Sequence, residues 1–164
     1  MIKVKFSYFF IYLTFVFCFC KGQTADKIHL TKIIFHSSRC NGICPSIDLE
    51  IDSSKNIIVT REYYKTKSDI DKRFSGQFSG FLDQSKYNEL IGLLQNSHLD
   101  TMKFPDITCC DGIITTLIVY YNGQRKYFKS MTPPRSTNEL ILFLDTIGND
   151  KKLIKTNKTK TIEE

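Results

Sequence analysis

Ser46-Ile47-Asp48-Leu49-Glu50-Ile51-Asp52 is the stretch that decides the fold class of this 164-residue chain. From residue 47 to residue 52, apolar and acidic side chains alternate without exception. Such alternation is typical of a β-strand that has one buried face and one face in water. The carboxylates on the polar face stand about 7 Å apart along the strand, which is too far for the converging oxygens of a calcium site. We therefore predict an amphipathic strand with a solvated acidic face.

Further strands are predicted around this segment, because several other short runs are rich in β-branched or aromatic residues. They are Thr31–His36, Ile57–Tyr64, Arg73–Gly80, Ile114–Tyr121 and Gln124–Lys129. The turn at residues 53–56 is expected to join the acidic strand to the next one as a hairpin. The last two strands flank Asn122-Gly123, which favours a type I′ turn because both of its central residues need a positive φ.

Two amphipathic helices are predicted, each with apolar residues spaced i, i+3, i+4 and i+7. The first stripe is Tyr87, Leu90, Ile91 and Leu94, and the second is Leu140, Phe143, Leu144 and Ile147. Asp83 is the expected N-cap of the first helix, Ser136-x-x-Glu139 is a capping box for the second, and Gly148 stands at its C′ position. Since each helix has one apolar stripe, each must pack on the sheet. The sequence thus predicts an α+β fold of order β-β-β-β-α-β-β-α, in which an antiparallel sheet of about five to six strands carries two helices on one face.

The N-terminus is interpreted as a secretory signal peptide, residues 1–22. A short basic stretch that holds Lys3 and Lys5 precedes an apolar run from Phe6 to Cys20. This run of 15 residues fits the hydrophobic region of a signal peptide and is too short to span a membrane. Cleavage is expected after Gly22, which would leave no transmembrane segment in the mature chain.

A bacterial lipoprotein signal is the alternative, with Cys18 or Cys20 as the lipid-modified residue. Such signals need a small residue just before the cysteine, whereas Phe17 and Phe19 stand there. A single uncleaved membrane anchor is a further alternative.

The rest of the chain divides into a lead-in at 23–30, a single α+β domain at 31–149 and a basic, disordered tail at 150–164. Removal of the signal peptide lowers the formal net charge from +6 to +3, because it removes three lysines. The tail lacks the aromatic residues that nucleic-acid grooves place among their basic ones, so no nucleic-acid partner is expected. The composition also excludes collagen, a coiled coil and a chain that is disordered throughout.

Four cysteines would remain after signal cleavage, namely Cys40, Cys44, Cys109 and Cys110. An even number of cysteines in an exported chain indicates disulfides, and three pairings are open. A local Cys40–Cys44 bridge would contribute about 2 kcal/mol, and a bridge from this loop to Cys109 or Cys110 about 4.4 kcal/mol. The motif loop around the first pair also contains Asn41, Gly42, Ile43 and Pro45.

No catalytic residue, metal site or cofactor is predicted. A thiol–disulfide enzyme usually has Cys-x-x-Cys spacing at a helix N-terminus, whereas this spacing is one residue longer and leads into a strand. A cysteine nucleophile would need a histidine base, for which His36 lies nearest in sequence, and adjacent cysteines suit a tetrahedral zinc site poorly. His36, Asp106 and Asp111 are candidates to line a small cleft beside the motif loop.

The stretch Cys40-Asn41-Gly42-Ile43-Cys44-Pro45, which opens an alternating strand, resembles the signature of a family of exported bacterial domains of unknown function, the domain-of-unknown-function 6438 type. The likeness extends over residues 31–149, through Cys110-Asp111-Gly112 and the final helix. Where the family pattern has an arginine, an aromatic residue and a tyrosine, this chain has Ser37, Asn41 and Ile47. The resemblance implies a small single domain behind a signal or lipoprotein peptide, and it implies no activity, substrate or cofactor.

These observations favour an exported, periplasmic or surface-associated module that is stabilised by disulfides and has no chemistry of its own. Its expected role is to bind another cell-envelope protein or to stabilise an assembly. The alternative is a thiol-dependent or redox-active envelope protein that uses the Cys40/Cys44 and Cys109/Cys110 cluster.

Overall fold

A computed structural model of the chain describes residues 27–107, 111–157 and 160–164. The predicted signal peptide, the lipoprotein alternative and both Cys109 and Cys110 lie outside these residues. Within the described ranges, no helix has the length and hydropathy that crossing a bilayer requires.

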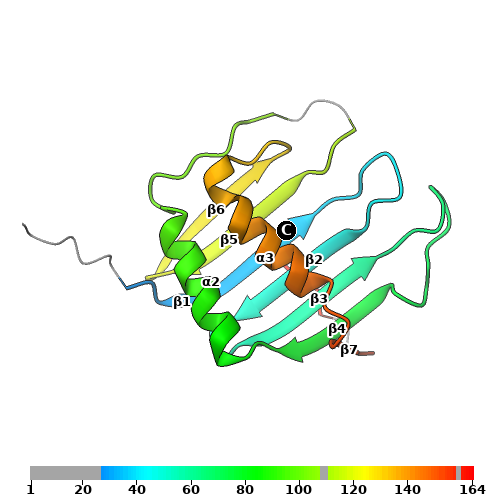
Figure 1. The fold of residues 1–164 in the computed structure, drawn as a ribbon, viewed down its shortest axis with the longest axis horizontal. Coiled ribbons are helices and arrows are strands. Elements are labelled where there is room, and N and C mark those ends of the chain that lie inside the picture. The colour runs from blue at the N-terminus through cyan, green and yellow to red at the C-terminus, as the bar shows by residue number, and fades with distance from the viewer. Residues whose placement is uncertain (1–26, 108–110, 158–159) are drawn as a thin grey trace, which may run out of the picture.

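The fold is α+β, as predicted, with one antiparallel sheet and two helices (Figure 1). The strands are β1 (Leu30–Ser37), β2 (Ser46–Asp52), β3 (Asn56–Glu62), β4 (Gly76–Phe81), β5 (Thr115–Tyr121), β6 (Gln124–Ser130) and β7 (Ile154–Lys155). Their order across the sheet is β6-β5-β1-β2-β3-β4-β7. The helices α2 (Gln84–Asn96) and α3 (Asn138–Gly148) lie on the same face of the sheet (Figure 1). The sheet therefore has seven strands among the described residues, and the predicted count of five to six is wrong.

The acidic strand lies near the centre of the sheet as β2, between β1 and β3. Its aliphatic side chains face the helices and are fully buried. The leucines of both helix stripes and Ile147 are buried with them, whereas Tyr87, Ile91 and Phe143 are partly buried and pack against this core. The main core residues on this side are Ile33, Phe35, Ile47, Leu49, Ile51, Val59, Leu90, Leu94, Leu117, Val119, Leu140 and Leu144. The alternation in the sequence therefore correctly assigned the apolar face of the strand.

Local turn and cap chemistry explains most element boundaries. Asn122 and Gly123 have φ values of 48° and 73°, so the expected type I′ hairpin is confirmed. The side chain of Asp83 accepts a hydrogen bond from the Lys86 amide at 2.8 Å, which confirms it as the N-cap of α2. The strand predicted from Arg73 begins later, because the amide of Ser75 is still hydrogen-bonded to the Asp71 carbonyl in a turn.

The capping box predicted for α3 is wrong. Residues Arg135–Thr137 form a 3₁₀ turn that leads into the helix, so Ser136 lies inside this turn. Thr137 is the N-cap, and its hydroxyl donates to the Pro134 carbonyl at 2.7 Å instead of capping α3. Gly148 is the last residue of α3 and not its C′ residue.

The segment expected to be a disordered tail contains the seventh strand. β7 pairs antiparallel with the edge strand β4, and Leu153 and Ile162 are buried. We refer to the described residues 150–157 and 160–164 as the C-terminal strap. Its lysines suggested a solvated chain, whereas its few aliphatic residues are what the sheet buries.

Candidate functional site

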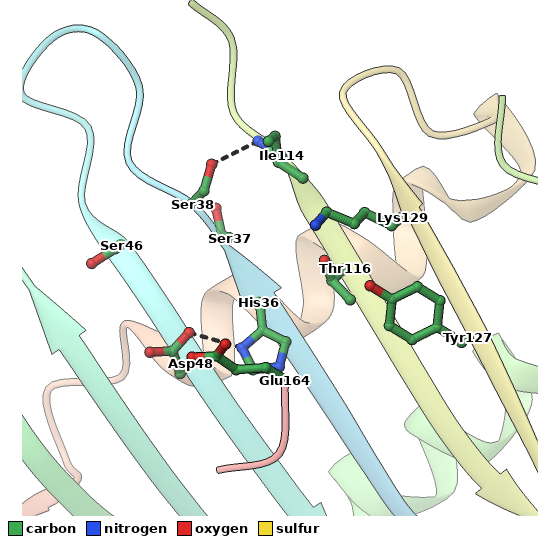
Figure 2. Close-up of a pocket in the computed structure, with 10 residues that line it drawn as sticks. All are labelled: His36, Ser37, Ser38, Ser46, Asp48, Ile114, Thr116, Tyr127, Lys129 and Glu164. Atoms are coloured by element: carbon green, nitrogen blue, oxygen red, sulfur yellow. Dashed lines mark hydrogen bonds and ion pairs between the residues drawn. The ribbon is translucent and has the colours of Figure 1, made fainter. Parts of the chain in front are cut away.

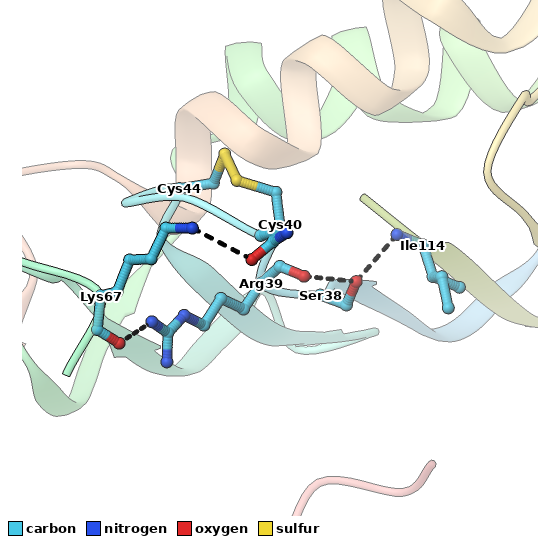
Figure 3. The surroundings of a disulfide bond; sticks show 7 residues. Ser38, Arg39, Cys40, Cys44, Lys67 and Ile114 are labelled. Atoms are coloured by element: carbon cyan, nitrogen blue, oxygen red, sulfur yellow. Dashed lines mark hydrogen bonds between the residues drawn. A yellow bond between two sulfur atoms is a disulfide. The ribbon is translucent and has the colours of Figure 1, made fainter. Parts of the chain in front are cut away.

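The motif loop connects β1 to β2 and is closed by a Cys40–Cys44 disulfide, with 5.5 Å between the two Cα atoms (Figure 3). Of the three pairings left open by the sequence, the structure thus contains the local one. Cys109 and Cys110 themselves lie outside the described residues.

Hydrogen bonds from two other loops hold the motif loop. The Asn41 side chain donates to Asp111 Oδ2 at 2.9 Å, and the Asn41 amide donates to the Asp111 carbonyl at 3.3 Å. Lys67 Nζ donates to Asn41 Oδ1 at 3.3 Å. The Arg39 guanidinium donates to the Lys67 carbonyl (Figure 3) and lies 4.0 Å from the ring centroid of Tyr64. The loop is therefore fixed at both sides as well as closed by the bridge.

The base of the loop is tied to the start of β5. The Ser38 amide donates to the Ile114 carbonyl at 2.9 Å, and the Ile114 amide donates to Ser38 Oγ at 2.8 Å (Figure 3). At the tip, Ile43 remains 62% exposed. A side chain on Gly42 would place its Cβ 3.3 Å from Cys40 Sγ, so the glycine allows the tight ring to close.

The structure brings only part of the predicted cleft together. Asp111 contacts the motif loop through Asn41, whereas Asp106 is exposed and does not line the pocket that contains His36. His36 lies on the sheet face that carries no helix, where it contacts the C-terminal strap. His36 therefore shares a pocket with Ser38 and Ser46, which flank the motif loop, while its hydrogen bonds go to Asp48 and to the strap.

Replacing both Cys40 and Cys44 with serine is expected to lower the free energy of unfolding by about 2 kcal/mol, because the five-residue ring no longer restricts the unfolded chain. Urea denaturation of the oxidised wild type and of the double variant measures this difference. Wild type denatured in the presence of a reductant serves as the control and should match the double variant. Equal midpoints for the double variant and the oxidised wild type would contradict the structural role of the bridge.

A second, smaller core lies on the sheet face opposite the helices. Ile34 of β1 and Ile118 of β5 are fully buried there, and Ile162 of the strap covers them. Ile58 and Tyr120 pack around this cluster. The strap therefore shields apolar side chains that the helices cannot reach.

Glu163 anchors the strap electrostatically. Its carboxylate accepts hydrogen bonds from Tyr120 at 2.7 Å, from Lys32 at 2.9 Å and from Arg125 at 3.1 Å. The Tyr120 hydroxyl and then the Lys32 ammonium are the main causes that lower the pKa of Glu163 to about 2. One residue of the strap thus joins β1, β5 and β6.

The acidic face of β2 differs from the solvated face that its pattern predicts. Glu50 is only 7% exposed and accepts a hydrogen bond from Lys160 of the strap at 2.7 Å. Asp48 pairs with His36 of β1. Cations from other parts of the chain therefore neutralise two of the three carboxylates.

His36 lies between two groups that accept hydrogen bonds. Its Nδ1 is 2.8 Å from Asp48 Oδ1 (Figure 2), and its Nε2 is 2.7 Å from the Glu163 carbonyl. Because an ionised carboxylate and a carbonyl can only accept, both ring nitrogens must donate, which requires the imidazolium form. Burial favours the neutral ring, but the hydrogen bonds and the nearby carboxylates of Asp48 and Glu164 outweigh it and raise the pKa of His36.

A pocket of about 240 Å³ lies beside this histidine at the end of the strap (Figure 2). It is lined by His36, Ser37, Ser38, Ser46, Asp48, Ile114, Thr116, Tyr127, Lys129 and Glu164. Its charged groups comprise two basic and two acidic side chains, and the remaining polar groups are mainly hydroxyls. Such a lining suits a neutral polar group better than a strongly charged ligand.

The charged form of His36 should make the stability of the protein depend on pH. A raised pKa in the folded state means that its contribution is complete below the ordinary histidine pKa of about 6.5 and is lost as the pH rises through the folded-state value. We expect a loss of about 1 to 2 kcal/mol for wild type over this range, and no such loss for His36→Gln. Thermal denaturation of both proteins between about pH 6 and pH 9 tests this, and parallel profiles would contradict it. The other titratable groups that line this pocket are Asp48, Tyr127, Lys129 and Glu164.

Arg61, which was not predicted from the sequence, is buried on the helix-facing side of β3. Its guanidinium donates to the Gly148 carbonyl at the end of α3 at 2.8 Å and lies 4.1 Å from the ring centroid of Phe78. Burial lowers the pKa of Arg61. A signal was present, since Ile57, Val59 and Arg61 alternate and must share one face of the strand.

The described residues contain no group of three or more His, Cys, Asp or Glu side chains that could hold a metal ion. What the geometry does define is a small α+β domain with a disulfide-closed loop and a strapped sheet face. Residues 31–149 match the family model described as Domain of unknown function (DUF6438). The chain therefore belongs to this family. No curated protein shows significant similarity to the chain.

Proposed function

We propose that this chain is an exported, non-catalytic module of the cell envelope that binds another envelope protein through its disulfide-closed loop. The observation that carries the proposal is the Cys40–Cys44 bridge, which closes an exposed loop between two central strands. Export is supported by the basic stretch and the apolar run within residues 1–22.

The geometry of the loop favours binding. Ile43 at its tip is mostly exposed, while Asn41 and Arg39 next to the bridge are fixed by hydrogen bonds to neighbouring loops. A loop that is already ordered loses little conformational entropy when a partner binds. An exposed aliphatic side chain on such a loop can serve as an anchor in a partner's pocket.

A thiol-dependent function is the second candidate, and one contact favours it. Asp111 directly follows Cys110 and is hydrogen-bonded to Asn41, which directly follows Cys40. The segment that leads away from the second cysteine pair is thus tied to the loop of the first pair. Exchange of a disulfide between the two pairs would be the chemistry of this candidate.

Photo-cross-linking in cells of the source organism tests the binding proposal. A photoreactive amino acid replaces Ile43, and in a control it replaces Leu142, which is 67% exposed on α3. We expect one discrete adduct with an envelope protein from position 43 and none from position 142. Equal adduct patterns at both positions, or a protein that stays in the cytoplasm with residues 1–22 attached, would contradict the proposal.

An insulin-reduction assay separates the two candidates. A non-catalytic bridge should give no more reduction of insulin than the Cys40→Ser/Cys44→Ser double variant. Turnover that depends on Cys40 and Cys44 would support the thiol-dependent candidate instead.

A further inference from the structure

We propose that the helix-free face of the sheet is a binding groove for an extended peptide from a partner protein. The peptide would carry an aliphatic residue followed by glutamate, and in this structure residues 160–164 fill the groove as a built-in ligand. The proposal does not depend on the disulfide, because side chains of β1, β3, β4, β5 and β6 form the groove.

The groove has an apolar subsite. Its floor is formed by Ile34 and Ile118, which are fully buried beneath Ile162 of the strap. Ile58 and Tyr120 border the subsite. A β-branched side chain fills it in this structure, so a partner residue of similar shape would fit.

Next to the apolar subsite is one for a carboxylate. Lys32, Tyr120 and Arg125 come from three neighbouring strands and all donate to the Glu163 carboxylate. Two cations and a hydroxyl that converge on one carboxylate give a strong preference for an acidic residue over a neutral one. Lys32 and Arg125 are both more than a quarter exposed, so a carboxylate can reach them from solvent.

The groove also recognises the main chain, which identifies the ligand as a peptide. The Gln77 side chain donates to the Lys160 carbonyl at 2.8 Å and accepts from the Lys160 amide at 2.9 Å. His36 Nε2 donates to the carbonyl of Glu163. These bonds would form with any extended chain that crosses the sheet at the same place, because they involve no ligand side chain.

The strap differs from the rest of the fold in how it is held. The residues matched by the family model end at residue 149, just before the strap begins. Beyond the two residues of β7, the contacts at 160–164 are made mainly by side chains of the sheet face. A competing peptide can replace such contacts one for one without breaking the backbone pairing of the sheet.

Fluorescence anisotropy with a labelled peptide of residues 156–164 tests the proposal on the full chain. In the full-length variant Ile162→Ser/Glu163→Gln the internal strap is weakened while the groove is intact. This variant should bind the peptide at least about tenfold more tightly than wild type, because the strap no longer competes for the groove. A peptide that carries the same two substitutions is the matched control and should not bind.

Groove variants locate the peptide. Adding Lys32→Ala or Gln77→Ala to the strap-weakened chain should lower peptide affinity again by about tenfold. Circular dichroism checks that each variant is folded. If the folded, strap-weakened chain binds the peptide no better than wild type, or if the groove substitutions have no effect, the proposal is wrong.

Discussion

Replacing Arg61 with alanine is expected to lower the free energy of unfolding by about 3 kcal/mol. Arg61 is 5% exposed, and its guanidinium donates to the carbonyls of Gly148 at 2.8 Å, Asp150 at 3.3 Å and Phe74 at 3.3 Å. It therefore provides a hydrogen-bond donor for the carbonyl at the C-terminal end of α3 and joins this helix to β3. Its removal leaves buried carbonyl groups without donors and opens a gap beside the Phe78 ring.

Urea denaturation of Arg61→Ala and of two further variants measures this effect. Arg135→Ala is the control, since Arg135 is exposed and its loss should change stability by less than about 0.5 kcal/mol. Arg61→Lys should retain part of the stability, because an ammonium can still donate to the Gly148 carbonyl. An Arg61→Ala variant as stable as Arg135→Ala would show that the buried guanidinium is not needed.

Replacing Gly148 with alanine is expected to lower the free energy of unfolding by about 2 kcal/mol, and valine should lower it further. A Cβ at this position would lie 2.7 Å from Ile47 Cγ2 and 3.8 Å from Val59 Cγ2. Ile47 is fully buried in the sheet, and buried side chains are close-packed with few voids. The end of α3 would have to move away from β2 and β3.

Gly92 in α2 provides a matched control for Gly148. A Cβ at Gly92 would meet no atom within 4 Å, so Gly92→Ala should raise stability by about 0.5 to 1 kcal/mol through helix propensity alone. Thermal denaturation of both variants makes the comparison. Two alanine variants with shifts of the same sign would contradict the close packing of α3 on the sheet.

The sequence was sufficient to predict those elements whose signals are local. The alternation at 46–52 correctly placed Ile47, Leu49 and Ile51 in the core, and Asn122-Gly123 correctly placed a hairpin. Hydrophobic spacing also predicted both helices on one face of an antiparallel sheet. Each of these signals depends only on residues that are close together in the sequence.

The remaining features depend on contacts between distant residues. The sequence pattern around Glu50 predicts a solvated carboxylate, but Lys160, 110 positions later, is hydrogen-bonded to it in the structure. The strap has the composition of a frayed tail. Its few aliphatic residues stabilise the fold only because the folded sheet presents an apolar surface for them to cover. Likewise, spacing alone could not choose among the three cysteine pairings.

The two candidate sites also differ in how far local sequence predicts them. The motif loop was predicted by its cysteines, and its contact with Asp111 agrees with the expectation that this aspartate lies near the loop. His36 lines a pocket with Ser38 and Ser46 beside the same loop, but its hydrogen bonds go to Asp48 and to the strap. A histidine at a strand end can point to either sheet face, and the assignment depends on register, which the sequence of one strand does not give.

Alkylation of the native protein, followed by tryptic peptide mapping, tests whether Cys40 and Cys44 form a structural disulfide. Cys40 and Cys44 share one tryptic peptide, residues 40–55. We expect this peptide to be unmodified and two hydrogen atoms lighter than its reduced form, since a structural bridge leaves no thiol to react. A peptide that carries the alkylating group on both cysteines of the folded protein would contradict it.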